Sequence, residues 1–313
     1  MFDANELIND FKMQGIFVSE ITGHGGGNSQ LFKFKLNSKM YVLKVYKGEK
    51  NRIENSKKRE TKAIEFLKEN RFNNIPKLVS EFSPSNGICM EYVKGKAPKQ
   101  NRSSQSKIFK TLLKLKKMFL RNPNFQPAVD ASGETDEIIK QIDSRLIDLR
   151  NIPLNLQLRF EYILNVLKNE SSIKFSSETM TYSFSDLGVH NIIKSGNKFI
   201  FIDYEFFGKD SAIKMLIDYL LHPKNIISNN LLNSTLKFGE KKFFINPDIF
   251  LQAVPYFSLK WVTILAKRFK EDDIKNSKIK NVKNLEWYLV LSSLSNTREI
   301  YKFLSNRDTI IQL

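Results

Sequence analysis

The hydrophobic and polar positions of this chain change their period near Gly95. Before that residue, short stretches alternate between apolar and polar residues, as in Leu31–Leu36, and this alternation predicts half-buried strands. After it, apolar residues recur at intervals of three and four, which predicts helices. We therefore expect an α+β protein with two lobes, residues 1–94 and residues 95–313.

The first lobe is predicted to be an antiparallel sheet with one inserted helix. The helix covers Ser56–Glu69, where the apolar residues fall at helical spacing. Turn-forming residues separate neighbouring strands, as in the segment Asn37-Ser38-Lys39. The predicted strands are Ile16–Ile21, Leu31–Leu36, Met40–Tyr46, Lys77–Phe82 and Ile88–Tyr92.

The second lobe is predicted to be mostly helical, with one short β hairpin inside it. The hairpin pairs Ile192–Ile193 with Phe199–Ile202 through the turn residues Ser195-Gly196-Asn197. The predicted helices are Lys107–Leu120, Thr135–Arg150, Leu156–Lys168, Ile213–Leu221, Pro247–Val254, Leu259–Phe269 and Leu285–Leu304.

The charge of the chain is strongly positive. Its 313 residues include 50 Lys and Arg against 33 Asp and Glu, which gives a net charge of +17. Such an excess raises the question of nucleic-acid binding, but the cations are mostly lysines and are scattered along the sequence. We therefore interpret them as a solvated surface and expect no specific nucleic-acid partner.

Cysteine and histidine are rare. Cys89 is the only cysteine, so the chain forms no internal disulfide and no cysteine-based zinc site. Three widely spread histidines do not favour a histidine-based metal site. The start of the chain lacks a basic and apolar leader, and we saw no apolar run near the ~18 residues that span a bilayer. We expect a cytoplasmic protein without a membrane span.

A glycine cluster, Gly23-His-Gly-Gly-Gly-Asn-Ser29, lies between the first two predicted strands. Glycines let backbone N–H groups approach phosphate oxygens closely, although a plain hairpin turn has the same composition. P-loops and dinucleotide-binding turns require a helix directly after the glycines, whereas a strand follows here. The pattern therefore favours a glycine flap that covers phosphates.

Lys44 lies within the apolar strand Met40–Tyr46. A lysine there costs free energy unless it is paired, or unless it lies at an edge and reaches water. The functional interpretation is a cation for the α- and β-phosphates of a nucleotide. Glu60 is its predicted partner, because it precedes Ala63 and Ile64 by three and four residues on the buried side of the predicted helix.

A third constellation surrounds the predicted hairpin of the second lobe. Asp186 is followed by Asn191, and Asp203 ends the apolar strand Phe199–Ile202. A carboxylate can accept the proton of a hydroxyl group, and carboxylate and amide oxygens are ligands that Mg²⁺ prefers. The alternative is that Asp186 and Asn191 are ordinary turn residues and that Asp203 only ends the strand. Asp186 is the candidate base, and Asn191 and Asp203 are the candidate Mg²⁺ ligands.

Together these motifs resemble the aminoglycoside phosphotransferase and choline kinase-like family, small-molecule kinases with a protein-kinase-like fold. The resemblance covers about Ile21 to Pro223, with the motifs in family order. They are Gly27-Asn28-Ser29, Val42-Leu43-Lys44, Arg59-Glu60 with Phe66-Leu67 and Ile75-Pro76, Cys89-Met-Glu-Tyr-Val-Lys-Gly95, and the set of Asp186, Asn191 and Asp203.

The resemblance implies a role for each matched residue. Gly27, Asn28 and Ser29 would lie under the phosphates of ATP, and Lys44 would bind them, held by Glu60. The backbone carbonyl of Glu91 and the N–H of Val93 would contact adenine, with Met90 behind it. Asp186 would be the catalytic base, and Asn191 and Asp203 would hold Mg²⁺. Glu205 would assist them, and Asp218 would support the catalytic loop.

One departure from the family pattern concerns the residues before the catalytic aspartate. The family usually has His-Gly-Asp there, whereas this chain has Phe184-Ser185-Asp186. The amino-acid sequence around Asp186 resembles that of a bacterial subgroup of uncharacterised phosphotransferases. His190 is expected to pack the loop or contact substrate, and His222 to cap a helix or lie at the surface.

The predicted function is ATP- and Mg²⁺-dependent phosphorylation of a small-molecule hydroxyl. A net charge of +17 disfavours polycationic aminoglycosides, so a sugar or similar metabolite is preferred as acceptor. The alternatives are an aminoglycoside or a choline- or ethanolamine-type amino alcohol. An alternative outside the enzymes is a non-catalytic, nucleotide-binding pseudokinase.

Overall fold

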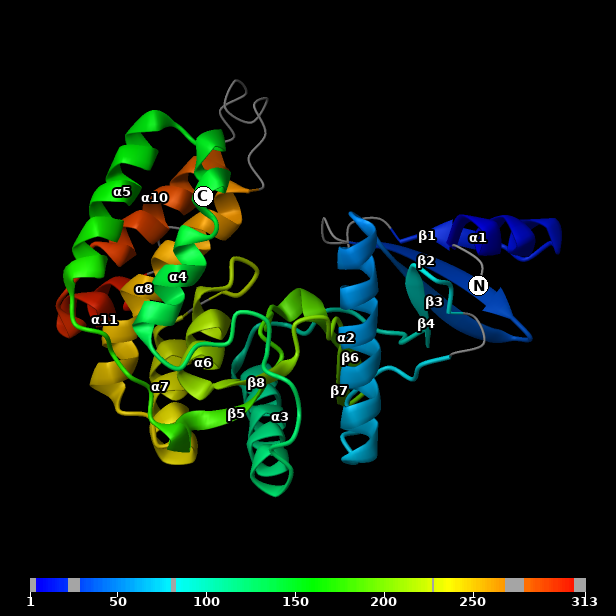
Figure 1. Cartoon of the computed structure of the whole chain (residues 1–313). Coiled ribbons are helices and arrows are strands. Elements are labelled where there is room, and N and C mark those ends of the chain that lie inside the picture. Colours follow the sequence, from blue (N-terminus) through cyan, green and yellow to red (C-terminus); the bar gives the residue numbers. More distant parts are fainter. Residues whose placement is uncertain (1–3, 22–28, 80–82, 227, 268–278, 307–313) are drawn as a thin grey trace. The chain divides into compact units, whose positions relative to one another are not determined.

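The computed structural model describes residues 4–21, 29–79, 83–226, 228–267 and 279–306. The chain forms two compact units (Figure 1). The first combines Met1–Lys99 with Gly188–Phe207, and the second combines Gln100–Leu187 with Gly208–Leu313. The first unit thus extends to Lys99, and it also includes residues 188–207, which the prediction assigns to the second lobe.

The reason for this grouping is hydrogen bonding between the hairpin and the first unit. The hairpin consists of β6 (Ile192–Ser195) and β7 (Lys198–Phe201). The N–H of Lys194 donates to the carbonyl of Lys96 at 2.8 Å, and the N–H of Phe201 donates to that of Asn74 at 2.9 Å. Contacts between residues so distant in sequence leave no periodic pattern. The prediction therefore places the hairpin in the second lobe, because it follows residue 95 in the chain.

The first unit is built on an antiparallel sheet with the strand order β1-β2-β3-β4. Two helices belong to it, α1 (Ala4–Met13) and α2 (Lys50–Glu69). The strands are β1 (Val18–Glu20), β2 (Ser29–Leu36), β3 (Lys39–Tyr46) and β4 (Gly87–Glu91). The predicted antiparallel sheet and its helix Ser56–Glu69 are confirmed, and the helix begins earlier than predicted.

Alternation along β3 gives the sheet two different faces. Tyr41, Leu43 and Val45 join the core cluster that contains Ile8 and Phe11 of α1. Lys44 and Tyr46, which alternate with them, contact Glu60 of α2 instead. One face of the sheet is therefore an ordinary apolar core, and the other carries charge.

Two features of the first unit differ from the prediction. Of the fourth predicted strand, Lys77–Phe82, the described residues 77–79 form a bridge between Leu78 and Met90, and residues 80–82 lie outside the described residues. Helix α1 was not predicted, although its residues Ile8 and Phe11 are spaced to meet one face of the sheet.

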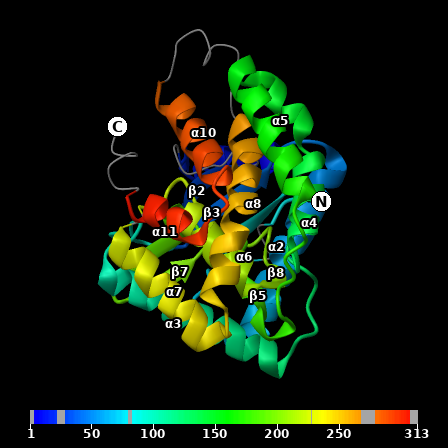
Figure 2. The same ribbon diagram turned by 90° about the vertical axis from the view of Figure 1, so that its left-hand side faces the viewer.

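The second unit is mostly helical, as predicted. Helix α8 packs against several neighbours in it, as Figure 2 shows for α6, α10 and α11. Two short strands, β5 (Met180–Ser183) and β8 (Gly208–Ser211), pair antiparallel and were not predicted. The helices are α3 (Arg102–Arg121), α4 (Thr135–Asp143), α5 (Leu154–Asn169), α6 (Ala212–Leu221), α7 (Asn229–Phe243), α8 (Pro247–Ala266), α10 (Ile279–Ser292) and α11 (Thr297–Ser305).

Several helix boundaries differ from the prediction. The predicted helix Leu285–Leu304 is two helices, because the side chain of Asn296 accepts from the N–H of Arg298 and begins α11. The predicted helices Pro247–Val254 and Leu259–Phe269 correspond to one helix, α8, that runs through Pro255 and ends at Ala266, and residues 268–269 lie outside the described residues. Helix α7 was missed, although Leu232, Thr235, Gly239 and Phe243 are buried at helical spacing.

Helix α8 differs from the prediction in a second respect. Within the described residues it is long and apolar enough to cross a membrane, with a mean hydropathy of 1.4, although no such run was expected. In this structure 78% of that window is buried inside the protein, against α4, α6 and α10 among others. Burial all around explains its composition, because a helix at the centre of a domain has no polar face.

Candidate active site

Lys44 is buried in the first unit and held by two carboxylates. Its side chain is 5% exposed. The ammonium lies 2.6 Å from Oε2 of Glu60 and 2.8 Å from Oδ1 of Asp203. The predicted ion pair between Lys44 and Glu60 is thus formed, and it includes a third residue that is distant in sequence.

Glu60 is fully buried and accepts three hydrogen bonds. Besides the ammonium of Lys44, the hydroxyl of Tyr46 donates to Oε2 at 2.7 Å, and the N–H of Tyr204 donates to Oε1 at 3.2 Å. A buried carboxylate is costly unless its oxygens are satisfied in this way. The two tyrosine contacts were not predicted, because neither residue lies near Glu60 in sequence.

The preceding residue, Arg59, fastens the same helix to the segment after β7. Its guanidinium donates to the carbonyls of Glu205 at 3.1 Å and Phe207 at 3.4 Å. Arg59 and Glu60 therefore contact residues 204–207 together. This arrangement fixes α2 against the chain that carries Asp203.

Asp203 leaves β7 through an unusual backbone conformation. Its φ is 68°, in the left-handed region that aspartate tolerates better than most residues. The side chain is 29% exposed, whereas those of its partner Lys44 and of the other carboxylate, Glu60, are buried. Asp203 thus presents a carboxylate that both holds Lys44 and remains accessible.

The electrostatics of this cluster favour a charged lysine. Burial by itself would lower the pKa of Lys44, but the attraction of Asp203, Glu60 and Glu205 outweighs it and raises that pKa. Burial and the neighbouring Glu60 also raise the pKa of Tyr46, so its hydroxyl stays protonated and donates. The carboxylates of Asp203, Glu60 and Glu205 together carry more negative charge than the ammonium of Lys44 neutralises. This excess suits a site for a divalent cation.

Asn191 lies beside the end of the same hairpin. It is 7% exposed, and its carbonyl accepts the N–H of Ile202 at 2.9 Å, next to Asp203 in the chain. An amide oxygen and a carboxylate thus belong to one small element of the first unit. This donor set has the chemistry of a Mg²⁺ site, and the assignment of Asn191 and Asp203 as ligands stays a prediction.

The remaining nucleotide residues predicted from the resemblance lie on or near the sheet. Ser29 opens β2, Met90 is buried in β4, and Glu91 ends that strand. Val93 follows β4 by two residues. Gly27 and Asn28 lie outside the described residues. Their nucleotide contacts stay predictions.

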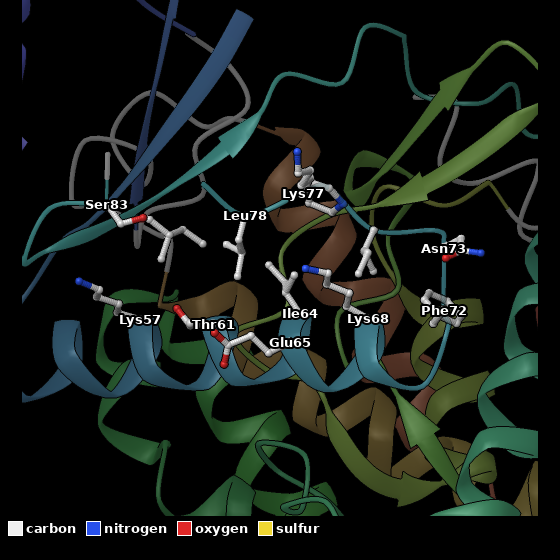
Figure 3. A pocket seen from close by; sticks show the side chains of 13 residues that line it. Lys57, Thr61, Ile64, Glu65, Lys68, Phe72, Asn73, Lys77, Leu78 and Ser83 are labelled. Carbon is white, nitrogen blue, oxygen red and sulfur yellow. The ribbon is translucent and has the colours of Figure 1, made fainter. Parts of the chain in front are cut away.

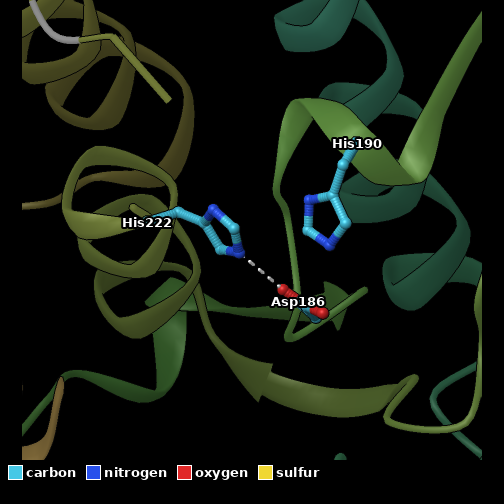
Figure 4. Close-up of side chains that lie close together, drawn as sticks. All are labelled: Asp186, His190 and His222. Atoms are coloured by element: carbon cyan, nitrogen blue, oxygen red, sulfur yellow. Dashed lines mark ion pairs between the residues drawn. The ribbon is translucent and has the colours of Figure 1, made fainter. Parts of the chain in front are cut away.

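Asp186 belongs to the second unit and follows β5. The N–H of Asp186 donates to the carbonyl of Phe184 at 2.7 Å, and Ser185 has a φ of 59°, so the chain turns sharply here. Oδ1 of Asp186 lies 3.0 Å from Nε2 of His222, as the dashed line in Figure 4 marks. His222 caps α6 as predicted, but it is buried rather than at the surface.

Asp218, predicted to support the catalytic loop, has a different side-chain partner. Its carboxylate lies 3.0 Å from the ammonium of Lys214, which also lies 2.9 Å from Asp210. Burial opposes the charge on Lys214, but the two carboxylates outweigh it and raise the pKa of this lysine. Through its backbone carbonyl, Asp218 accepts the N–H of His222 at 2.9 Å.

A second charged group in this unit joins α8 to the chain before α4. The ammonium of Lys260 lies 2.6 Å from Oε1 of Gln141 and 3.4 Å from the carboxylate of Asp130, which also pairs with Arg145. Burial and the nearby Lys214 lower the pKa of Lys260 to about 8, although Asp130 opposes the shift. No motif or periodic pattern indicates this group in advance.

A pocket of about 450 Å³ lies beside α2 in the first unit (Figure 3). Ile64, Leu78 and Ile88 are among its apolar walls, and Lys57 and Lys68 lie on its helical side. None of the predicted site residues lines this pocket. It is therefore separate from the cluster around Lys44.

Comparison with known proteins identifies the family. Residues 18–212, more than half of the chain, match the choline/ethanolamine kinase family. The chain belongs to this family. The predicted resemblance is confirmed, and membership makes the protein a small-molecule phosphotransferase. No curated protein matches the sequence.

Solved kinases share the fold at low sequence identity. A choline kinase from Cryptosporidium parvum Iowa II is 13% identical, with a TM-score of 0.64, and the match covers 99% of this chain and 100% of that one. A choline kinase from Streptococcus pneumoniae is 15% identical, with a TM-score of 0.59 and coverage of 90% and 99%. A spectinomycin phosphotransferase is 10% identical, with a TM-score of 0.58 and coverage of 97% and 98%. These likenesses confirm the kinase-like fold.

Proposed function

We propose that this protein transfers the γ-phosphoryl group of ATP, with Mg²⁺, to a hydroxyl group of a small molecule. The observation that carries the proposal is the buried ammonium of Lys44, held by Glu60 and Asp203. A fixed cation beside a partly exposed carboxylate is the arrangement that phosphoryl transfer needs, because catalysis there consists mainly of positioning and charge stabilisation.

The first unit would bind the nucleotide. Lys44 would neutralise charge on the phosphates, and Glu60 and Arg59 keep it in place through their contacts with the segment after β7. The solved spectinomycin phosphotransferase of the same fold contains ADP, and an amicoumacin kinase contains the ATP analogue AMP-PNP. These neighbours support nucleotide binding by this chain.

The same unit would hold Mg²⁺ through Asn191 and Asp203. Both offer hard oxygen ligands near the end of one hairpin, in surroundings where negative charge is in excess. When bound, the ion neutralises charge on the phosphate oxygens. Asp203 would also keep Lys44 oriented, so this carboxylate serves two partners.

Asp186 would accept the proton of the acceptor hydroxyl. Its side chain is 29% exposed, and a turn after β5 fixes its backbone. Transfer requires the nucleotide held by the first unit to reach this residue of the second. A carboxylate positioned near a hydroxyl contributes about 10²- to 10⁴-fold to such reactions.

For the acceptor we propose a sugar or a similar neutral or anionic metabolite. The net charge of +17 opposes polycations, and the second unit places Lys260 and Arg145 together around a single carboxylate, Asp130. Choline and ethanolamine are the second candidates, because the matching family phosphorylates these amino alcohols.

A phosphotransfer screen tests the proposal. The purified chain is incubated with ATP and Mg²⁺ and with sugars, choline, ethanolamine or aminoglycosides, and ADP formation is measured. We expect acceptor-dependent ADP formation that Asp186→Asn abolishes. Nucleotide binding without transfer to any acceptor would instead support a pseudokinase, and failure to bind ATP would contradict the proposal as a whole.

A further inference from the structure

His222 is buried at the end of α6 and points at Asp186 (Figure 4). Its imidazole is 7% exposed, and its Nε2 lies 3.0 Å from Oδ1 of the aspartate. The two residues are distant in sequence, but both belong to the second unit. A buried polar ring in contact with the candidate base calls for an explanation in terms of what it donates.

The hydrogen bonds of the ring define its tautomer. The backbone N–H of Lys224 donates to Nδ1 of His222 at 3.0 Å, so Nδ1 is the acceptor. In a neutral imidazole the other nitrogen then carries the proton. Nε2–H therefore faces Oδ1 of Asp186 and donates to the carboxylate.

Packing and backbone contacts fix the orientation of the ring. Trp261 of α8 lies against it edge to face, with 5.3 Å between ring centroids and an interplanar angle of 83°. The N–H of His222 donates to the carbonyl of Asp218 at 2.9 Å. A ring held at its backbone, at Nδ1 and on its side has little freedom to turn away from Asp186.

The sequence around Asp186 shows why such a contact matters. The two residues directly before it are Phe184 and Ser185, and neither is a histidine. His222 brings an imidazole to this carboxylate from the end of α6. A hydrogen bond donated to a carboxylate favours its ionised form, which is the form that accepts a proton.

We propose that His222 is the positioning residue for Asp186. Its Nε2–H donates to the carboxylate and holds it in one orientation toward the acceptor hydroxyl. This role rests on the proposed kinase function, in which Asp186 is the base. The competing explanation is that the side chain of His222 only closes the turn after α6, by accepting the N–H of Lys224 at Nδ1.

Two substitutions separate these explanations. In His222→Asn, the amide oxygen can still accept from Lys224, but the donor to Asp186 is lost. In His222→Gln, the longer side chain places an amide N–H near the position of Nε2, while the hydrogen bond from the N–H of Lys224 is lost. Each variant therefore keeps one of the two hydrogen bonds.

The measurements are kcat and KM with the best acceptor of the screen, ADP affinity by calorimetry, and thermal unfolding. We expect His222→Asn to lower kcat about 10- to 100-fold, as is typical when a residue that orients a functional group is lost. KM and ADP affinity should stay within about twofold of wild type, and His222→Gln should recover most of kcat. Wild-type kcat in His222→Asn, or a greater loss in His222→Gln, would overturn the positioning role.

A measurement without turnover distinguishes failure of this inference from failure of the proposed function. Nitrogen NMR of the imidazoles, assigned with His222→Gln, reports which ring nitrogen carries the proton. We expect Nε2–H for His222, with a shift that changes in Asp186→Asn. A proton on Nδ1 would overturn the inference even in an active kinase. The expected tautomer in a chain that transfers no phosphate would refute the proposed function instead.

Discussion

The substitution Glu60→Gln tests the buried charge cluster most directly. Glutamine has the size of glutamate, but it replaces one carboxylate oxygen by an NH₂ group and removes the charge. Oε1 can still accept from the N–H of Tyr204, while the position of Oε2 now opposes donors from Lys44 and Tyr46. The change therefore removes electrostatic partners without creating a cavity.

The size of the effect follows from burial and from the remaining partner. Removing one member of a buried ion pair costs about 3–5 kcal/mol, because the other charge stays buried without compensation. Lys44 keeps Asp203 at 2.8 Å, and that carboxylate is 29% exposed. We therefore expect the lower end of the range, a loss of about 3 kcal/mol in the free energy of unfolding.

Urea unfolding of wild type and variants measures this loss. Glu54→Gln is the matched control, since Glu54 is exposed on the same helix and should change stability by no more than about 0.5 kcal/mol. Lys44→Met combined with Glu60→Gln completes a double-mutant cycle. A loss below about 1 kcal/mol for Glu60→Gln, or additive effects in the cycle, would refute the reasoning.

Three further predictions concern catalysis, pH and packing. Asp186→Asn should keep Mg·ATP affinity and lose most turnover, whereas Asp203→Asn should lose Mg²⁺-dependent nucleotide affinity as well; equal affinities in calorimetry would show that these roles are wrongly divided. Because burial lowers the pKa of Lys260 from 10.5 to about 8, the folded state binds this proton less tightly than the unfolded chain. The free energy of unfolding of the wild type should therefore rise by about 3 kcal/mol relative to that of Lys260→Met between about pH 8 and pH 10.5. If the two proteins instead show parallel curves of unfolding free energy against pH, this pKa assignment is contradicted. Gly95→Ala should unfold at a lower urea concentration than wild type, because the new Cβ would lie 2.3 Å from the carbonyl oxygen of Lys194. Gly133→Ala serves as the control, because the nearest atom to its new Cβ would be 3.8 Å away.

The local pattern of apolar and polar residues predicted much of the structure of the first unit. Alternation along β3 placed Lys44 on the opposite face from Leu43 and Val45, and helical spacing placed Glu60 on the buried side of α2. The pairing of these two charges was therefore predictable. It was predictable because a charge on an apolar face needs a nearby partner of opposite sign.

Other parts of the fold gave weaker signals. Helix α7 buries only four residues at helical spacing, two of them Thr235 and Gly239, and β8 is only four residues long, so the apolar pattern of both elements is weak. The chain from Leu285 to Leu304 has apolar residues on both sides of one short polar stretch, Ser295–Glu299, and within that stretch the cap by Asn296 begins α11. Boundaries of this kind depend on a single hydrogen bond rather than on a repeating pattern.

Side-chain type and strand or helix period are local properties, so the sequence alone predicts the candidate residues Lys44, Glu60, Asp186 and Asp203. The tertiary structure decided which partners they have. Asp203 reaches Lys44, Tyr204 reaches Glu60, and His222 reaches Asp186 only after distant segments pack together. Such contacts are fixed by the long-range packing of buried surfaces, and a buried polar group takes whichever partner that packing brings within hydrogen-bond distance.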